Sequence, residues 1–257
     1  MIEKYSPYIR AFGWGIVGII LSLLSRKFLS TSNYSQELGS ISNIIALFGV
    51  LFGLLLAFVV FEAWKQFTDL GNSIIQEATG CERLFRTYRY LRDSKKEAEF
   101  KKVVISYLNC IVEDNFESNA TGKRSPKAST AFREISHSIN DIDFNDDHDS
   151  VVFGQLLDDY SDLSEVRNTR IGQATTRLPD ILKGLVELLL IVVQGMVVIM
   201  PFNNTLYQAY FSFALFFFLG LLRFLILDLD NPFKGYWNQT TDEYKRVIGS
   251  LEKNYND

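Results

Sequence analysis

The sequence predicts an all-α integral membrane protein with four spans and a helical cytosolic domain. The first observation behind this prediction is a run from Ile44 to Phe61 without any charged, polar or proline residue. About 20 mostly apolar residues cross a hydrocarbon core of about 30 Å, so residues 41–64 can span a membrane. The second observation is that further apolar runs lie near both ends of the chain, separated by a polar region with helical periodicity.

The composition excludes several classes of function. The chain has 257 residues, of which 47% are apolar, and a formal net charge of -4. A nucleic-acid binder is expected to show a basic patch or a known module, and this sequence has neither. The two cysteines, Cys81 and Cys110, are too few for a disulfide framework, so we expect two reduced thiols in a cytosolic compartment.

The first span is predicted at residues 11–24, lengthened to residues 8–28 by basic side chains that reach outward to the membrane surface. A signal peptide is the alternative interpretation, because two basic residues precede this apolar run. However, Ser25-Arg26-Lys27 follows the run directly and a small-residue cleavage site is missing. We therefore interpret the segment as a retained span.

The second span, at residues 41–64, carries two parallel strips. Gly49, Gly53 and Ala57 recur every four residues and so share one helix face, where small residues let helices approach closely in lipid. Beside this strip lies one of larger apolar residues with the same spacing. Its members are Val50, Leu54 and Phe58.

No proline interrupts the helical pattern after the second span, so we expect this helix to continue into the cytosol as far as about Leu91. More helices are predicted in the polar region. They lie at residues 103–112, 130–140 and 151–176. Composition predicts the segments between them as a turn at 93–100, a loop at 115–129 and an acidic turn at 141–150.

The third and fourth spans are predicted at residues 180–200 and 206–229, followed by a short tail helix at about 241–253. Cytoplasmic loops carry the excess of lysine and arginine, which places both termini in the cytoplasm and leaves Arg26 and Lys27 as the one conflict. The predicted domains follow from these assignments. They are two spans at 1–64, a cytosolic helical domain at 65–177, two spans at 178–233 and a cytosolic tail at 234–257.

Ionisable residues inside the spans are candidate functional residues. Lys183 and Glu187 are four residues apart and can pair on one helix face, and Asp228 can help to neutralise Arg223 across a turn and a half. We expect structural pairing rather than ion contact for both sets.

Four arginines recur at every third residue of the continued second helix and form a slowly turning basic stripe. They are Arg83, Arg86, Arg89 and Arg92. Such a stripe can attract anions or lipid headgroups. The alternative, which we favour for most of the four, is a set of salt bridges to the helix that holds Asp158, Asp159, Asp162 and Glu165.

The sequence offers no residues for an enzyme, a cofactor or a metal. Counted from Asp141, the first residue of the acidic turn at 141–149, the sixth and twelfth positions of an EF-hand loop need glycine and glutamate but hold Asp146 and Val152, so we interpret the turn as a solvated one. His137 and His148 are too isolated for a metal site. A Gly-rich phosphate loop, a nucleophile elbow and a zinc motif are also missing.

The chain resembles the bestrophin-like membrane proteins, and more closely a bacterial bestrophin-like family. The resemblance covers most of the chain and includes the long polar insert between the second and third spans. The motifs that carry it are FGVLFGLLLAFVVFEAWKQFTDL, QEATGCERLFRTYRYL and DLDNPFKG, the last of which contains Asn231, Pro232 and Phe233.

The resemblance implies a homo-oligomeric channel, pentameric in bestrophins, in the lipid bilayer of a bacterial inner (plasma) membrane. Bestrophins have a hydrophobic neck of bulky residues four apart on the second span, and the matching positions here are Val50, Leu54 and Phe58. An apolar constriction can gate by dewetting. Calcium-gated bestrophins carry an acidic run after Asn-Pro-Phe, where this chain continues with Lys234 and Gly235, so we do not expect a calcium clasp.

The leading hypothesis is therefore an oligomeric ion channel, and the arginine stripe favours small inorganic anions as the permeant species. The alternative is a non-conducting membrane scaffold or sensor that binds a partner through its cytosolic helices. Oligomer stoichiometry separates the two, because a pore needs a ring of copies whereas a scaffold can be a dimer. A membrane-bound enzyme is the weakest hypothesis, since no catalytic constellation is visible.

Overall fold

The computed structural model describes residues 6–28, 38–114, 116, 118, 121, 123–143, 147–200 and 202–254. Within these residues every element of regular secondary structure is a helix, which confirms the predicted all-α class. In this described part of the chain, four helical stretches are long and apolar enough to cross a membrane. By composition and length they are Pro7–Lys27, Ser42–Leu91, Asp147–Ile199 and Thr205–Asp230.

The chain folds as two compact units. Unit 1 comprises residues 1–65 and 177–237, and unit 2 comprises residues 66–176 and 238–257. The helices of unit 1 are α1 (Ser6–Phe28), the first part of α2 (Leu38–Tyr88), α7 (Asp180–Ile199) and α8 (Thr205–Asp230). One helix, α2, therefore contributes residues to both units, as predicted from the uninterrupted periodicity that follows the second span.

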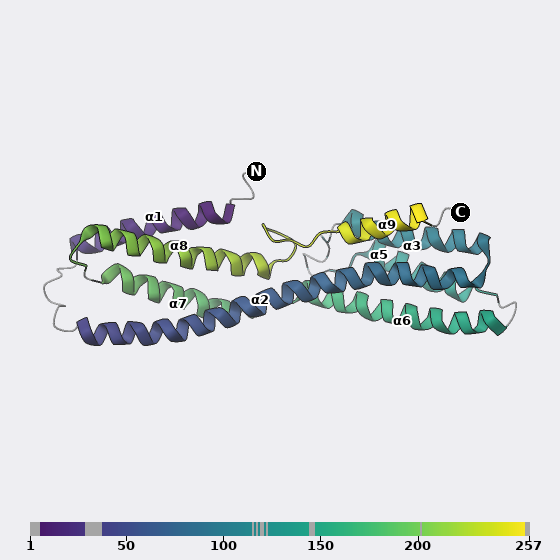
Figure 1. The fold of residues 1–257 in the computed structure, drawn as a ribbon, viewed down its shortest axis with the longest axis horizontal. Helices are drawn as coiled ribbons and strands as arrows, with labels where there is room; N and C mark the ends of the chain where they lie inside the picture. The colour runs from purple at the N-terminus through teal and green to yellow at the C-terminus, as the bar shows by residue number, and fades with distance from the viewer. Residues whose placement is uncertain are drawn as a thin grey trace. The chain divides into compact units, whose positions relative to one another are not determined.

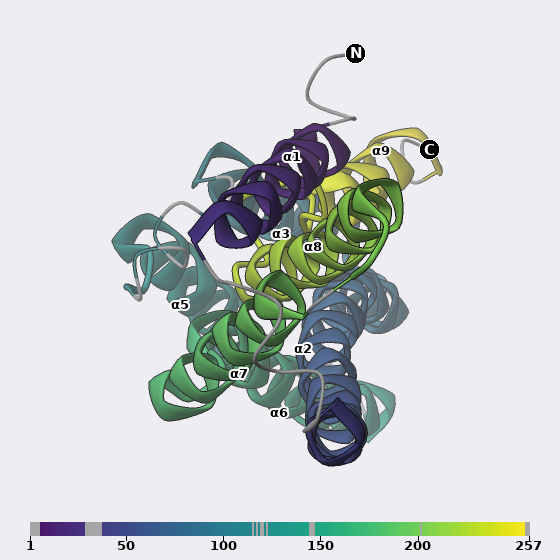
Figure 2. The ribbon, with the colours of Figure 1, turned by 90° about the vertical axis from the view of Figure 1, so that its left-hand side faces the viewer.

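In unit 1, α1 and α8 lie side by side along most of their length (Figures 1 and 2). Glycines make this close approach possible. A methyl group added at Gly18 would lie 2.6 Å from the Phe216 ring, and one added at Gly220 would lie 3.0 Å from Trp14. This is small-residue packing between spans, in which backbone proximity replaces the hydrophobic driving force that lipid does not supply.

Arg26 lies in the last turn of α1, and its contacts explain why this basic residue is tolerated at a span end where the orientation rule does not expect it. Its guanidinium donates to the carbonyls of Phe202 and Asn203, at 3.2 and 3.3 Å, and to the amide oxygen of Gln208 at 3.3 Å. The cation therefore satisfies carbonyl groups in the connection between α7 and α8. Its role is local hydrogen bonding, which charge counting does not detect.

Unit 2 is a helical bundle around a mixed aliphatic and aromatic core. Its helices are the second part of α2, η3 (Arg89–Leu91), α3 (Ser94–Asp114), α5 (Pro126–Asn140), α6 (Asp147–Thr175) and α9 (Asp242–Asn254). Phe85, Phe100 and Tyr107 are fully buried, and Tyr88 stacks on Phe100 with ring centroids 4.0 Å apart.

Three helices of unit 2 begin earlier than the sequence predicted, one of which is α6, expected at residue 151 and observed from Asp147. Helix α3 was expected at residue 103 after a turn at 93–100, but it begins at Ser94, because the Asp93 carboxylate accepts the backbone N–H groups of Lys95 and Lys96 at 3.1 Å. Helix α5 was expected at residue 130 and begins at Pro126, where Ser125 supplies the N-cap. At the starts of α3 and α5, a side-chain cap accepts hydrogen bonds from the first free N–H groups of the helix.

The C-terminal helix α9 is an integral part of unit 2. Tyr244, Val247 and Leu251 are fully buried, and α9 packs against α3. The segment that leads into α9 is also fixed, because the Gln239 amide donates to the Phe67 carbonyl at 2.9 Å.

Candidate functional site

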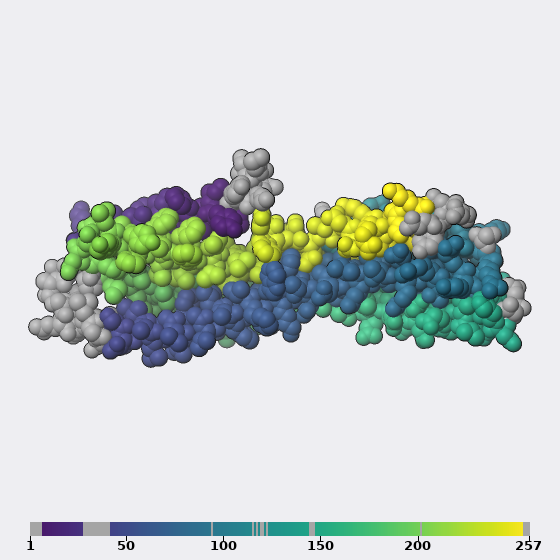
Figure 3. All heavy atoms as spheres, viewed as in Figure 1, coloured from purple at the N-terminus to yellow at the C-terminus, as the bar shows by residue number. Residues whose placement is uncertain are grey.

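The residues predicted to form the neck lie on α2 and are open within a single chain. Val50, Leu54 and Phe58 are 62, 68 and 58% exposed, whereas Phe52 and Leu56 on another face of the same helix are buried. In the space-filling view, the first part of α2 is uncovered along the face that is shown (Figure 3). The strip is thus available to lipid, to another copy of the chain or to a lumen.

The strip of small residues on α2 is open as well. A methyl group added at Gly49 or Gly53 would meet no atom within 4 Å, and Ala57 is exposed. This contrasts with Gly18 and Gly220, where aromatic rings of a neighbouring helix occupy the space that a side chain would need. Helix packing at the α2 strip stays a prediction, and any partner there must come from outside the described part of this chain.

Of the four stripe arginines, Arg83 forms the ion pairs that the alternative interpretation expected. Its Nε lies 3.3 Å from Asp159 Oδ1 and its Nη2 lies 3.0 Å from Asp162 Oδ2, both on α6. Asp159 is buried and also accepts the Thr87 hydroxyl at 2.6 Å. Arg83 therefore joins α2 to α6, and much of its charge is neutralised there.

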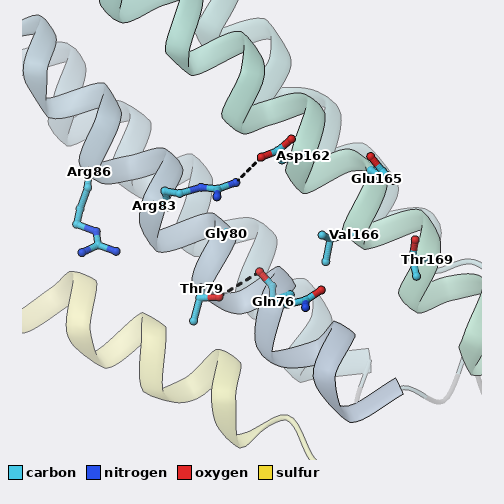
Figure 4. A pocket seen from close by; sticks show the side chains of 9 residues that line it. All are labelled: Gln76, Thr79, Gly80, Arg83, Arg86, Asp162, Glu165, Val166 and Thr169. Atoms are coloured by element: carbon cyan, nitrogen blue, oxygen red, sulfur yellow. Dashed lines mark hydrogen bonds and ion pairs between the residues drawn. The ribbon is translucent and has the colours of Figure 1, made fainter. Parts of the chain in front are cut away.

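Arg86 lines a cleft between α2 and α6 with a volume of about 480 Å³ (Figure 4). Its exposed guanidinium points away from the Arg83–Asp162 pair (Figure 4). The remaining lining is mostly polar and of mixed charge, with Gly80 and Val166 as its apolar members. It includes Gln76, Thr79, Glu165 and Thr169.

The other two arginines lie away from this cleft lining. Arg89 pairs with Glu97 on α3 at 2.7 Å. Arg92 follows η3 in a left-handed conformation, with φ of 58°, and its backbone N–H bonds to the Arg89 carbonyl. The structure thus brings two of the four arginines, Arg83 and Arg86, to one cleft, and leaves anion attraction by the whole stripe as a prediction.

The motif after the fourth span forms a compact turn around a carboxylate. Asp228, near the end of α8, accepts the backbone N–H groups of Tyr236 at 3.0 Å and Trp237 at 2.7 Å. Gly235 has φ of +116°, and a Cβ there would lie 1.8 Å from Asp228 Oδ1. Within this turn Pro232 is buried and the Lys234 N–H donates to the Asn231 carbonyl; a functional role for Asn231, Pro232 and Phe233 stays a prediction.

The ion pairs expected along single spans are instead formed with other partners. Glu187 of α7 accepts Arg223 of α8 through both carboxylate oxygens, at 2.7 and 2.9 Å. Lys183 reaches Asp230 at 2.7 Å and Asp180 at 3.7 Å. The Lys183–Glu187 and Arg223–Asp228 pairings were therefore wrong, because Glu187 and Arg223 pair with each other across α7 and α8 and Asp228 accepts backbone N–H groups of the following turn.

Sequence reasoning also missed a buried charge cluster in unit 2. Glu77 is fully buried and accepts hydrogen bonds from Arg170 on α6, Tyr107 on α3 and Tyr244 on α9, the last at 2.6 Å. Burial and the Glu77 charge raise the pKa of both tyrosines well above the usual value. A signal existed, since Glu77 falls at heptad-like spacing among the buried residues Leu70, Ile74, Cys81 and Leu84.

Among the described residues, no group of three or more histidine, cysteine or acidic side chains is placed to hold a metal ion. Residues 144–146 of the acidic turn lie outside the described part of the chain, so cation binding by that turn is untested. Cys81 is buried and Cys110 is partly exposed, and both are free thiols.

Comparison with known proteins identifies the family to which this architecture belongs. A family model for the bestrophin-like domain matches residues 16–238. The chain belongs to the bestrophin-like family. No curated protein matches this bestrophin-like chain.

Solved structures share the bestrophin-like fold. A single-residue variant of a bacterial bestrophin homologue from Klebsiella pneumoniae superposes with a TM-score of 0.78 at 11% identity, over 96% of this chain and 100% of that one. A second variant of the Klebsiella pneumoniae homologue gives 0.75 at 12%, over 95% and 100%. Together with the four candidate spans, these findings establish a bestrophin-like membrane protein.

Proposed function

We propose that this bestrophin-like protein is a homo-oligomeric ion channel whose pore is lined by α2, with an apolar neck at Val50, Leu54 and Phe58. The observation that carries the proposal is the open strip on α2. Large apolar side chains recur every four residues on a membrane-spanning helix, and none of them is buried within the described chain. In a ring of copies these side chains would meet around a common axis and close a narrow dewetting gate.

The ion preference is a finer part of the proposal, and we infer that the channel passes small anions. Cation-selective pores often use rings of acidic side chains, and α2 has no acidic residue from Ser42 to Phe61. Arg86 adds an exposed positive charge farther along the same helix. Arg83 and Arg89 contribute less, because each is paired with a carboxylate.

The membrane assignment of the two units belongs to the same proposal. We place unit 1 in the bilayer of a bacterial inner membrane, and unit 2 with both chain ends in the cytoplasm. Charge supports this orientation, since the connection between α7 and α8 carries no basic residue whereas unit 2 and the tail carry many.

The first test is the number of copies in the purified particle. Single-particle images of the protein in nanodiscs should show a closed ring of about five subunits, and native mass spectrometry should give the corresponding mass. A monomer or a dimer would contradict the pore and favour the scaffold hypothesis, in which α2 packs against a partner.

The second test is conductance in planar bilayers. Leu54→Ala and Phe58→Ala should each raise the single-channel conductance or the open probability, because truncation widens an apolar constriction. Leu188→Ala on α7 and Phe218→Ala on α8 are the matched controls, since these residues are similarly exposed at 57 and 62% but lie on other spans. Equal effects of neck and control variants would refute the neck.

Anion preference has its own readout. Under a tenfold KCl gradient the reversal potential should lie near the chloride equilibrium potential, and Arg86→Gln should move it toward zero. Reversal near the potassium potential would refute this part of the proposal while leaving a channel in place.

A further inference from the structure

A small cavity lies inside unit 2, where α3, α5 and α6 meet. Its volume is about 10 Å³, which is room for a single water molecule or a small ion. The polar part of its lining comes from Arg167 and Arg170 of α6, Asp114 of α3 and Ser125, the N-cap of α5. The rest of the lining is apolar. The cavity therefore presents two cations and one acid to an occupant.

Arg167 is a buried cation whose guanidinium is not fully satisfied. The residue is 8% exposed, its Nη2 donates to the Ser129 hydroxyl at 3.0 Å, and the guanidinium lies 4.8 Å from the centroid of the Phe132 ring. Its Nε is buried without a hydrogen-bond partner. In the described part of the chain, the ion pairs of α6 are formed by other residues. A buried charge is costly unless it is paired and hydrogen-bonded, so this side chain indicates an occupant that the described residues do not supply.

The other two charged residues of the lining already have partners. Arg170 is paired with Glu77. Asp114 accepts the Ser118 hydroxyl at 2.5 Å and the Ser118 N–H at 3.3 Å, so both of its carboxylate oxygens are used, although its negative charge stays near the cavity. Among the described lining residues, Arg167 is therefore the one whose charge is left without a partner.

The start of α5 adds to the positive potential at the cavity. Ser125 accepts the Ala128 N–H at 3.4 Å, and its hydroxyl can still donate, because a hydroxyl donates and accepts at the same time. Helix α5 is 15 residues long, and the N-terminal end of a helix carries a partial positive charge that favours anions. The cavity thus combines a buried unpaired N–H, a hydroxyl donor and a helix N-terminus.

We propose that this cavity is a halide-binding site, in which a chloride ion accepts the Arg167 Nε–H and the Ser125 hydroxyl. A chloride ion supplies the counter-charge that the buried guanidinium lacks, whereas a water molecule would satisfy the N–H and leave the charge uncompensated. Phosphate and organic anions are too large for a cavity of this volume. The site belongs to unit 2, whereas the predicted neck lies on the part of α2 in unit 1, so the ion is a structural ligand rather than a permeating one.

Bromide is the probe for the first test, because it replaces chloride and scatters X-rays anomalously. Crystals of the whole native protein soaked in sodium bromide should show an anomalous difference peak in the cavity, next to Arg167 Nε. Density in the cavity without an anomalous signal would identify a water molecule and overturn the proposal. A cavity without any density would overturn it as well.

Hydrogen exchange gives an independent readout in solution. The amides of α5 and α6 are followed by mass spectrometry in sodium chloride and in sodium gluconate at equal ionic strength, since gluconate is too large to enter. A ligand that binds only the folded state slows exchange through opening of unit 2 by a factor of 1 + [Cl⁻]/Kd, which is about tenfold when chloride is at about nine times Kd. Equal exchange in the two salts would refute the site.

Two substitutions and a control separate this site from general salt effects. Arg167→Gln should abolish the difference between the two salts, whereas Arg133→Gln, at an exposed arginine of α5, should preserve it. Asp114→Asn removes the acid of the lining and should therefore lower the apparent Kd for chloride. An unchanged Kd would contradict an anion in the cavity.

The test does not depend on one variant. If Arg167→Gln does not fold, Asp114→Asn and the bromide data on the native protein still decide. None of these readouts needs an ion current, so their failure is distinguishable from failure of the proposed channel.

Discussion

Replacing Glu77 with glutamine should strongly destabilise unit 2. The carboxylate is fully buried and is the acceptor for the Arg170 guanidinium, which is itself 3% exposed, and for the hydroxyls of Tyr107 and Tyr244. Glutamine keeps the size of the side chain but removes its charge, so the buried Arg170 loses the carboxylate with which it is paired. Breaking a buried pair from one side costs about 3–5 kcal/mol.

The same geometry ranks the neighbouring substitutions. Tyr244→Phe removes one hydrogen bond to a charged acceptor that keeps its other donors, so a loss of about 1.5–3 kcal/mol is expected. The controls, Glu134→Gln and Tyr90→Phe, alter exposed side chains and should stay within about 0.5 kcal/mol of the native protein.

Cys81 makes a direct assay possible. This thiol is fully buried in the same core, where burial, together with the negative charge of Glu77, raises its pKa well above the usual value. In a Cys110→Ser background it becomes the only thiol, so a maleimide dye that fluoresces on reaction reports the opening of unit 2 as temperature rises. The Glu77→Gln midpoint should fall by roughly 10 °C.

If the labelling midpoint of the Glu77→Gln protein equals that of the native protein, this reasoning is refuted. Such a result would mean that Arg170 finds another acceptor or reaches water in the variant. The double variant Glu77→Leu with Arg170→Met separates the causes, because removing both charges should restore part of the lost stability.

Three further predictions concern other parts of the fold. Gly235→Ala should lower the unfolding midpoint, since its Cβ would collide with Asp228 Oδ1 at a positive φ, whereas Gly184→Ala, in open space on α7, should be neutral or slightly stabilising. Gly18→Ala should loosen α1 from α8, which thermal unfolding would detect against the Gly13→Ala control, where a methyl group meets nothing within 4 Å. Burial, aided by the charge of Asp93, raises the pKa of Tyr88 to about 12. Tyr88 should therefore contribute stability that is fully present below about pH 10 and is lost as the pH rises through about 12. The midpoint of thermal unfolding should fall over that interval, and it should fall less in the Tyr88→Phe variant.

Much of the fold follows from periodicity, and α2 shows why. Its apolar positions continue at helical spacing from Ile44 past Trp64 without a proline, so the 51-residue helix could be predicted from the sequence. The start of α3 could not be predicted in the same way. Residues 93–100 are strongly charged and look like a turn, whereas in the structure the Asp93 carboxylate caps a helix that begins at Ser94.

The polar contacts were less predictable for a different reason. The predicted pairings joined residues one turn apart, Lys183 and Glu187, or a turn and a half apart, Arg223 and Asp228, on one helix. Pairing across helices depends on rotation and depth, which one sequence does not reveal. Glu77 was overlooked because an acidic residue is normally expected to be exposed to solvent. Its spacing among apolar residues indicates burial, and burial of an acid requires partners such as Arg170.

The bond between Tyr244 and Glu77 also constrains how the protein is made. The two residues are 167 positions apart, and α7 and α8 are synthesised between them. At roughly 5–20 residues per second the carboxylate waits on the order of 8–33 s for its last hydrogen-bond donor. Unit 2 therefore cannot complete its core until both later spans have left the ribosome, and a nascent chain that stops before residue 244 keeps an under-coordinated acid in its interior.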